Sequence, residues 1–263
     1  MKNYLESLEI GPDAARQYID ARSAFVELER SKKNALQYRG GMVWKTVDGK
    51  DYLIRTSTTG GQKSLGRLAD VGLDDYFRVV GTHALYAYEA AAGISFASEI
   101  TSTRDIDLLW DTRKRVMFSQ RLAKDSPSML AALQKVDMSF QILEDQKYTA
   151  INQNGFEVDI IRRMAEQDDP HPIRLSDAED DFWVVQANRA SELQNAEEFS
   201  EVVVAENGAM ARMTTIHPRV FADFKRWMSK EPDRDPVKRR RDALQADAVE
   251  WMLQERLPHL LKK

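Results

Sequence analysis

Two aspartates, Asp105 and Asp107, are separated by one residue within the otherwise apolar run 104–110. If this run is a strand, side chains at positions i and i+2 lie on the same face, so the two carboxylates project together. A carboxylate pair held in this way suits a hard cation such as Mg2+, which takes oxygen ligands. The alternative is a pair of surface aspartates at the end of a strand, and this motif alone leaves both interpretations open.

A small-residue turn precedes the carboxylate pair. Residues 76–80 form a short apolar run that predicts a strand, and Gly81-Thr82 then opens an alanine-rich segment that predicts a helix ending near Gly93. Free backbone N–H groups and the helix dipole favour an anion at such an N-terminus, and Gly81 would let the anion approach the backbone closely. The alternative is that Thr82 only caps the helix, which requires no ligand.

A third aspartate, Asp159, lies between Val158 and Ile160 in the apolar run 156–161. Together with residues 147–151, this run flanks Asn152-Gln153-Asn154-Gly155, and the Asn-Gly pair predicts a β-hairpin. Burying an unpaired carboxylate costs free energy, so Asp159 should have a cation or a hydrogen-bond donor as its partner.

The N-terminal elements would position these motifs. Residues 12–38 have the apolar spacing of an amphipathic helix, and residues 42–47 and 52–56 predict a hairpin around Asp48-Gly49. The Gly-rich stretch 57–67 predicts a loop. Either this loop contacts phosphate through Lys63 or Arg67, or it is a plain connection, since its glycine spacing is not that of a P-loop.

The C-terminal third predicts short strands and two helices. Residues 138–143, 182–185 and 201–205 have strand patterns, and residues 218–229 and 237–257 have helical patterns. In the last helix we expect Leu244, Ala248, Trp251 and Met252 to face inward. Its first turns carry a basic run that starts at Lys238, and a run of this kind is usually a solvated face. We expect Asp235 and Asp242 to pair with neighbouring arginines.

Composition limits the classes of protein to consider. The chain has 263 residues, 43% apolar and 30% charged, with a net charge of −4, so any nucleic-acid binding would need a local basic patch. The lack of cysteine excludes disulfide partners, a thiolate zinc site and a cysteine nucleophile. We see neither an apolar signal-peptide core nor a run long enough to span a membrane, and therefore expect a cytoplasmic protein with no membrane partner.

The three motifs, in this order, resemble the nucleotidyltransferase superfamily of the DNA polymerase β fold. The resemblance rests on Val79-Val80-Gly81-Thr82, on Asp105-Ile106-Asp107 and on Val158-Asp159-Ile160. More narrowly, the chain is similar to an uncharacterised bacterial nucleotidyltransferase group in which residues 42–56, 63–66 and 218–242 also have counterparts. One departure is Thr82, where the superfamily usually has serine or glycine, although a threonine hydroxyl can still donate to a phosphate.

The resemblance implies an α+β fold with a small mixed-sheet nucleotidyltransferase core at residues 71–168. An N-terminal helix and hairpin would occupy residues 1–70, and a mainly helical region with short strands residues 169–263. It also implies a Mg2+-dependent transferase that moves NMP from an NTP to a hydroxyl acceptor and releases pyrophosphate. The acceptor stays open among RNA such as tRNA, protein and small molecules, and a toxin-like enzyme that modifies tRNA is one subtype.

The resemblance also implies roles for particular residues. Asp105, Asp107 and Asp159 would hold two Mg2+ ions, or Mn2+ in their place, with Asp159 on the side of the acceptor. Gly81 and Thr82 would hold phosphate oxygens, and Lys225 or Lys238 would contact the triphosphate, unless Lys225 is only an exposed helical lysine. His83, beside the turn, is either an ordinary packing residue or a catalytic one.

Two other functions fit the same residues. One is a catalytically silent module of the same fold that binds a nucleotide or RNA, although such a module would not need three aspartates in one place. The other is a metal-dependent phosphoesterase that uses the same carboxylates.

Overall fold

The computed structural model describes residues 37–39, 42–47, 50–54, 56–57, 59–205 and 210–261. A small antiparallel sheet consists of β1 (Gln37–Arg39), β2 (Met42–Val47) and β3 (Lys50–Ile54). The pairing of Val47 with Lys50 confirms the first predicted hairpin, whose Asp48-Gly49 turn lies outside the described residues. Most of the predicted helix 12–38 also lies outside the described residues, and its last two residues, Gln37 and Tyr38, belong to β1 instead.

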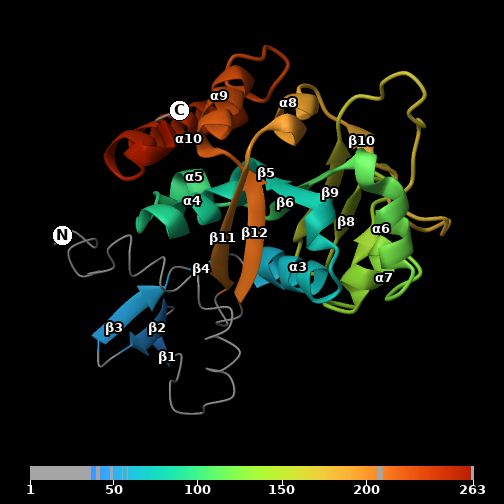
Figure 1. Ribbon diagram of the computed structural model, residues 1–263, viewed down its shortest axis with the longest axis horizontal. Helices are drawn as coiled ribbons and strands as arrows, with labels where there is room; N and C mark the ends of the chain where they lie inside the picture. The colour runs from blue at the N-terminus through green and yellow to red at the C-terminus, as the bar shows by residue number, and fades with distance from the viewer. Residues whose placement is uncertain are drawn as a thin grey trace.

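A mixed sheet of nine strands forms the centre of the described chain (Figure 1). Its strand order is β4-β11-β12-β5-β6-β9-β8-β7, with β10 paired to the far end of β9. Strand β6 runs antiparallel to β5 and parallel to β9, so the two acidic strands are neighbours. The strands are β4 (Thr56–Ser57), β5 (Phe77–Val80), β6 (Asp105–Trp110), β7 (Gln141–Ile142), β8 (Thr149–Ile151), β9 (Glu157–Arg162), β10 (Val185–Gln186), β11 (Glu198–Ala205) and β12 (Met210–Ile216).

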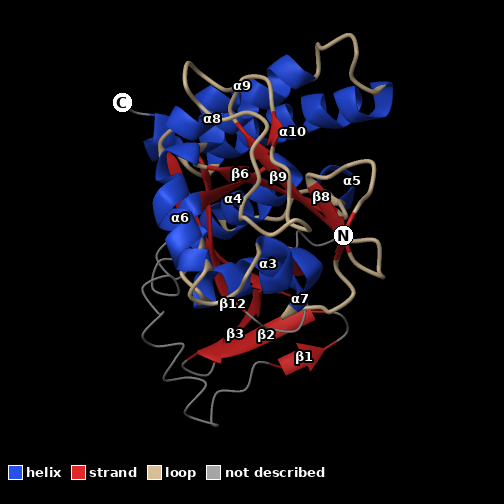
Figure 2. Cartoon of the chain, turned by 90° about the vertical axis from the view of Figure 1, so that its right-hand side faces the viewer, coloured by secondary structure: helices blue, strands red, loops and turns tan. Residues whose placement is uncertain are grey.

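Helices cover both faces of this sheet, and each face has its own apolar core. On one face, Ile106 and Leu108 of β6 pack with α3 (Thr59–Asp70), α6 (Arg115–Leu122) and α7 (Met129–Gln134). On the other, Leu109 packs with α4 (Ala84–Ala92), α8 (Ala190–Asn195), α9 (Pro218–Met228) and α10 (Pro236–Glu255). Figures 1 and 2 show α9 and α10 on the opposite side of the sheet from α3. The molecule is therefore an α+β protein with a mixed sheet, as predicted.

Several predicted elements are confirmed. Strand β5, helix α4, strand β6 and the β8–β9 hairpin lie where the motifs require them, and Gly93 ends α4 in the left-handed conformation with φ 62°. The two predicted C-terminal helices correspond to α9 and α10. Among the described helices, none combines the length and the apolar character needed to cross a bilayer.

The predicted loop 57–67 is wrong, because most of this stretch belongs to helix α3. Leu65 and Leu68 of this helix are buried in the sheet core, and tertiary burial of this kind outweighs the low helix propensity of Gly60 and Gly61. Arg67 pairs with Asp125 at 2.5 Å, so its guanidinium stabilises the packing of α3 and is not available to bind a phosphate.

Three smaller predictions also need correction. The strand expected at 138–143 is reduced to β7, and the strand expected at 182–185 is reduced to β10, which overlaps the predicted range only at Val185. The connection between α4 and β6 contains a short helix, α5 (Ser98–Thr101). In α10, Leu244 and Trp251 are 37% and 48% exposed, whereas Met252 is buried as expected. The buried face of α10 consists of Asp242, Gln245, Ala246, Val249, Met252 and Leu253.

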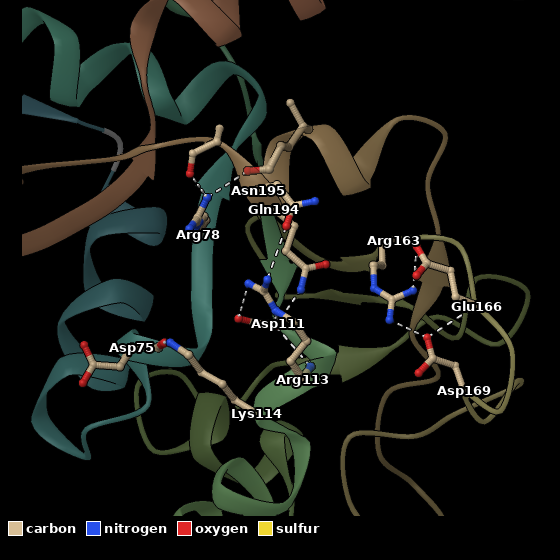
Figure 3. A network of polar contacts seen from close by, with 12 residues as sticks. Asp75, Arg78, Asp111, Arg113, Lys114, Arg163, Glu166, Asp169, Gln194 and Asn195 are labelled. Carbon is tan, nitrogen blue, oxygen red and sulfur yellow. Dashed lines mark hydrogen bonds and ion pairs between the residues drawn. The ribbon is translucent and has the colours of Figure 1, made fainter.

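A polar network fastens α8 to the end of β6 that lies away from the carboxylate pair (Figure 3). Arg78 of β5 donates to the backbone carbonyls of Leu193 and Ala196 at 2.9 and 2.7 Å. Asp111, directly after β6, accepts from Arg113 at 2.8 Å and from Gln194 at 2.6 Å. These bonds hold the C-terminal end of β6 in place. The pairing of β6 with β5 and β9 positions its acidic N-terminal end.

Candidate active site

The turn after β5 brings its backbone against a carboxylate of β6. Val80, the last residue of β5, is the Cα partner of Asp107, and the one-turn 3-10 helix η2 (Gly81–His83) follows. Gly81 has φ +68°, and a Cβ atom at this position would lie 2.0 Å from Oδ2 of Asp107. Only glycine therefore fits between the turn and the carboxylate.

The close approach at Gly81 predicts a large effect of one added methyl group. Gly81→Ala should lower the free energy of unfolding by about 1–3 kcal/mol, because alanine is strained at this φ and its Cβ displaces Asp107. Gly66→Ala is the matched control, since a Cβ there meets nothing within 4 Å and glycine disfavours a helix interior. Urea unfolding should thus show opposite signs for the two variants, and equal changes would contradict this account.

The three predicted carboxylates lie on one face of two adjacent strands. In the parallel register of β6 and β9, Asp107 is opposite Asp159, and Asp105 is opposite Glu157. The strand alternation places them on the face of Leu109, which is the face that α9 and α10 cover. A threonine hydroxyl donates to two of them: Thr103 to Asp105, and Thr149 to Asp159 at 2.5 Å. The partner that Asp159 was expected to need thus includes Thr149.

Electrostatics at this face disfavour carboxylate charge. Burial, together with the nearby Asp105 and Asp159, raises the pKa of Asp107 to about 7, although the cations of Lys225 and Arg234 oppose the shift. The pKa of Asp159 is also raised, mainly by burial, against the hydrogen bond from Thr149. The carboxylates therefore repel one another and need positive charge between them.

The residues present fit a divalent metal by their chemistry. Three carboxylates that share a strand face supply the oxygen ligands that Mg2+ prefers, and a cation would relieve the repulsion that raises the pKa of Asp107. In the described part of the chain, no group of three or more histidine or acidic side chains is already arranged as a metal site. Asp105 and Asp159 would have to exchange part of their threonine contacts for the ion.

The Thr82 hydroxyl is held by helix α10. Gln245 donates from Nε2 to Oγ1 of Thr82 at 3.2 Å and to the carbonyl of Ile100 at 2.7 Å. Because Gln245 donates, Thr82 is the acceptor in this bond, and its own hydroxyl proton is available for another acceptor. The alternative interpretation, in which Thr82 caps the helix, is not supported in this segment, where no side chain caps η2 or α4.

His83 is a packing residue in this structure. Its ring is buried and makes edge contacts with Tyr86 and Phe156, with centroids 5.5 and 6.0 Å apart. Burial lowers its pKa to about 4, against the opposing effect of Asp105, so the ring is neutral at physiological pH. These contacts favour the packing interpretation of His83 over a catalytic one.

Lysines of the predicted site have different environments. Lys225 of α9 is 4% exposed, and its Nζ donates to Oδ1 of Asp242 at 2.9 Å, so it is not an exposed helical lysine. Lys238 is exposed, and its charge acts on Asp159. The backbone of Lys63 lies in α3, but its side chain is outside the described part of the structure.

The sequence did not indicate two residues of this site, Arg234 and Gln245, and it indicated only one of the two partners of Asp242. We expected a neighbouring arginine as its partner, and the guanidinium of Arg234 does bond to it, but so does Lys225. Neither Arg234, in the loop before α10, nor Gln245, on the buried face of α10, has a sequence pattern that would have indicated its place.

Comparisons with known proteins identify the family of this chain. Among solved structures, the antibiotic-resistance factor ANT(2'')-Ia is similar over 76% of this chain and 91% of its own, with 14% identity and a TM-score of 0.31. The comparison with curated proteins finds no significant match. A protein-family model described as nucleotidyltransferase matches residues 62–263, which include every element of the large sheet except β4. The chain therefore belongs to a nucleotidyltransferase family of transferases.

Proposed function

We propose that this protein transfers NMP from an NTP to a hydroxyl acceptor, with Mg2+, at the face shared by β6 and β9. The observation that carries the proposal is the strand register, which sets Asp107 beside Asp159 with Asp105 on the same face. The Gly81 turn lies against Asp107, so a phosphate-binding backbone and a carboxylate site meet at one point.

The chemistry assigns each residue a task. Asp105 and Asp107 would hold both metal ions, and Asp159 would be a further ligand of the ion on the acceptor side. When bound, these ions supply the positive charge that stabilises the attacking and departing oxygens. Asp159 would also orient the attacking hydroxyl and take up its proton.

The residues of the turn would bind the leaving group. As the acceptor oxygen forms its bond to the α-phosphorus, the bond from that phosphorus to the bridging oxygen breaks, and the electron pair leaves with pyrophosphate. The N–H groups around Gly81 and the hydroxyl of Thr82 would donate to the phosphate oxygens. Gln245 supports this role of Thr82, because it leaves the hydroxyl proton free to point at the ligand.

A transfer assay tests the proposal. We would incubate the protein with each of the four NTPs, labelled at the α-phosphate, together with Mg2+ and one acceptor class at a time: RNA, protein or small hydroxyl compounds. Asp159→Asn should abolish labelling, because it removes a carboxylate from the acceptor side. Asp145→Asn, an exposed aspartate in a loop, is the control and should label normally.

Three results would count against the proposal. Equal labelling by wild type and Asp159→Asn would show that Asp159 is not part of the active site. NTP binding that is indifferent to Mg2+, without any transfer, would favour the silent binding module. Release of phosphate from a monoester would favour the phosphoesterase.

A further inference from the structure

A buried aspartate beside the carboxylate site holds two cations. Asp242 of α10 is fully buried, and Lys225 donates to its Oδ1 at 2.9 Å. The Nε of Arg234 donates to the other oxygen, Oδ2. One negative charge thus faces two positive charges, and the cluster has a surplus positive charge in a place where burial makes unbalanced charge costly. Part of this surplus faces Asp107, on which both cations act, and a bound anion would balance the rest.

Only one of the two cations can reach a ligand. The side chain of Lys225 is 5% exposed and is committed to Asp242, whereas the side chain of Arg234 is 24% exposed. Asp242 takes the Nε of Arg234, and within the described residues the two Nη nitrogens make no hydrogen bond. The guanidinium is therefore fixed along one edge and open along the other, the geometry in which arginine binds phosphate with two parallel bonds.

The position of this cluster is next to the carboxylates. Both Arg234 and Lys225 act electrostatically on Asp107, the residue against which the Gly81 turn packs. Thr82, in the same turn, is bonded to Gln245, which lies three residues after Asp242 on the buried face of α10. Helix α10 therefore carries Asp242 of the cluster and also contacts the turn that we propose binds phosphate.

We propose that Arg234, oriented by Asp242, is the residue that binds the triphosphate, while Lys225 acts behind it as a buried counter-charge. This inference rests on the proposed function, since it names the group that receives the phosphates at the same site. It replaces the expectation that Lys225 itself contacts the nucleotide. An arginine there would balance the charge that the triphosphate brings to a site with three carboxylates.

Calorimetry with Mg2+ and inorganic tripolyphosphate tests this assignment without knowledge of the base or the acceptor. Arg234→Gln should weaken tripolyphosphate binding by about tenfold or more, because a bidentate charge-assisted contact is lost. Arg234→Lys should recover part of the affinity as a point charge. Arg219→Gln, which removes an exposed arginine of α9, is the matched control and should bind like wild type.

The variant should fold, because Arg234→Gln leaves Lys225 and Asp242 as a balanced pair, and its melting temperature would verify this. In a transfer assay, the KM for the NTP should rise by about tenfold with a smaller change in kcat. Affinity of Arg234→Gln within twofold of wild type would overturn the assignment, as would a wild type that binds no tripolyphosphate. A loss of binding in Arg234→Gln in a protein that never transfers NMP would support Arg234 and contradict only the proposed function.

Discussion

Asp107→Asn should abolish nucleotidyl transfer and yet make the metal-free protein more stable. Asp107 shares a strand face with Asp105 and is opposite Asp159, and we propose that it binds both metal ions, so its loss should lower kcat by about a thousandfold or more. The same burial and crowding that suit it to a metal make it unfavourable without one. Burial and its acidic neighbours raise its pKa to about 7 from an ordinary value of 3.8.

The sign of the pH effect follows from that shift. Between pH 4 and pH 7 the unfolded chain gives up the Asp107 proton more readily than the folded chain, so ionisation favours unfolding over this range. The penalty grows as the pH rises and levels off above about 7. Asparagine cannot ionise, so the variant should gain up to about 4 kcal/mol over wild type at pH 8 and little at pH 4.

Urea unfolding in EDTA at pH 4 and pH 8 would measure this difference. Asp145→Asn, in an exposed loop, should change neither the stability nor the transfer rate. Addition of Mg2+ should reduce the difference in the free energy of unfolding between wild type and Asp107→Asn, because the ion binds the aspartate of wild type more tightly than the asparagine of the variant. A variant that is less stable than wild type at pH 8 in EDTA would show that Asp107 does not carry the repulsion we assign to it.

The local motifs of this site were predictable from the sequence because they depend on short-range geometry. The alternation of a strand places Asp105 and Asp107 on one face, and the Asn-Gly pair ahead of residues 156–161 positions Asp159 on a hairpin strand. The pairing of β6 with β9 joins segments far apart in the chain, and no spacing within either strand encodes it. We predicted that Asp159 joins Asp105 and Asp107 only because of the family resemblance.

The errors have a common physical cause, which is that tertiary contacts decide what local pattern cannot. The glycines at the start of α3 predict a loop, but burial of Leu65 and Leu68 makes a helix. In α10, the apolar stripe of Leu244 and Trp251 is partly exposed, and the helix instead buries the face that carries Asp242 and Gln245. A search for apolar periodicity discards polar residues of this kind, although they are the ones that reach the site.

Asp242→Asn should be among the most destabilising substitutions in the chain. It leaves Lys225 buried without its anion, and burial already lowers the pKa of Lys225 against the opposing effect of Asp242. Removing one partner of a buried ion pair costs about 3–5 kcal/mol. The matched control is Asp247→Asn on the same helix, whose carboxylate is 62% exposed and pairs with Arg226, and which should cost less than about 1 kcal/mol.

The double variant Lys225→Met/Asp242→Asn separates stability from binding. Removing the buried cation together with its anion should restore most of the free energy of unfolding, measured by urea titration, because the charge left without its partner is that of the partly exposed Arg234. Tripolyphosphate affinity should stay low in the same protein, because Arg234 has lost the carboxylate that orients its guanidinium. If Asp242→Asn costs no more than Asp247→Asn, the buried pair is not the structural link we describe. Full recovery of affinity in the double variant would show that Arg234 needs no orientation by Asp242.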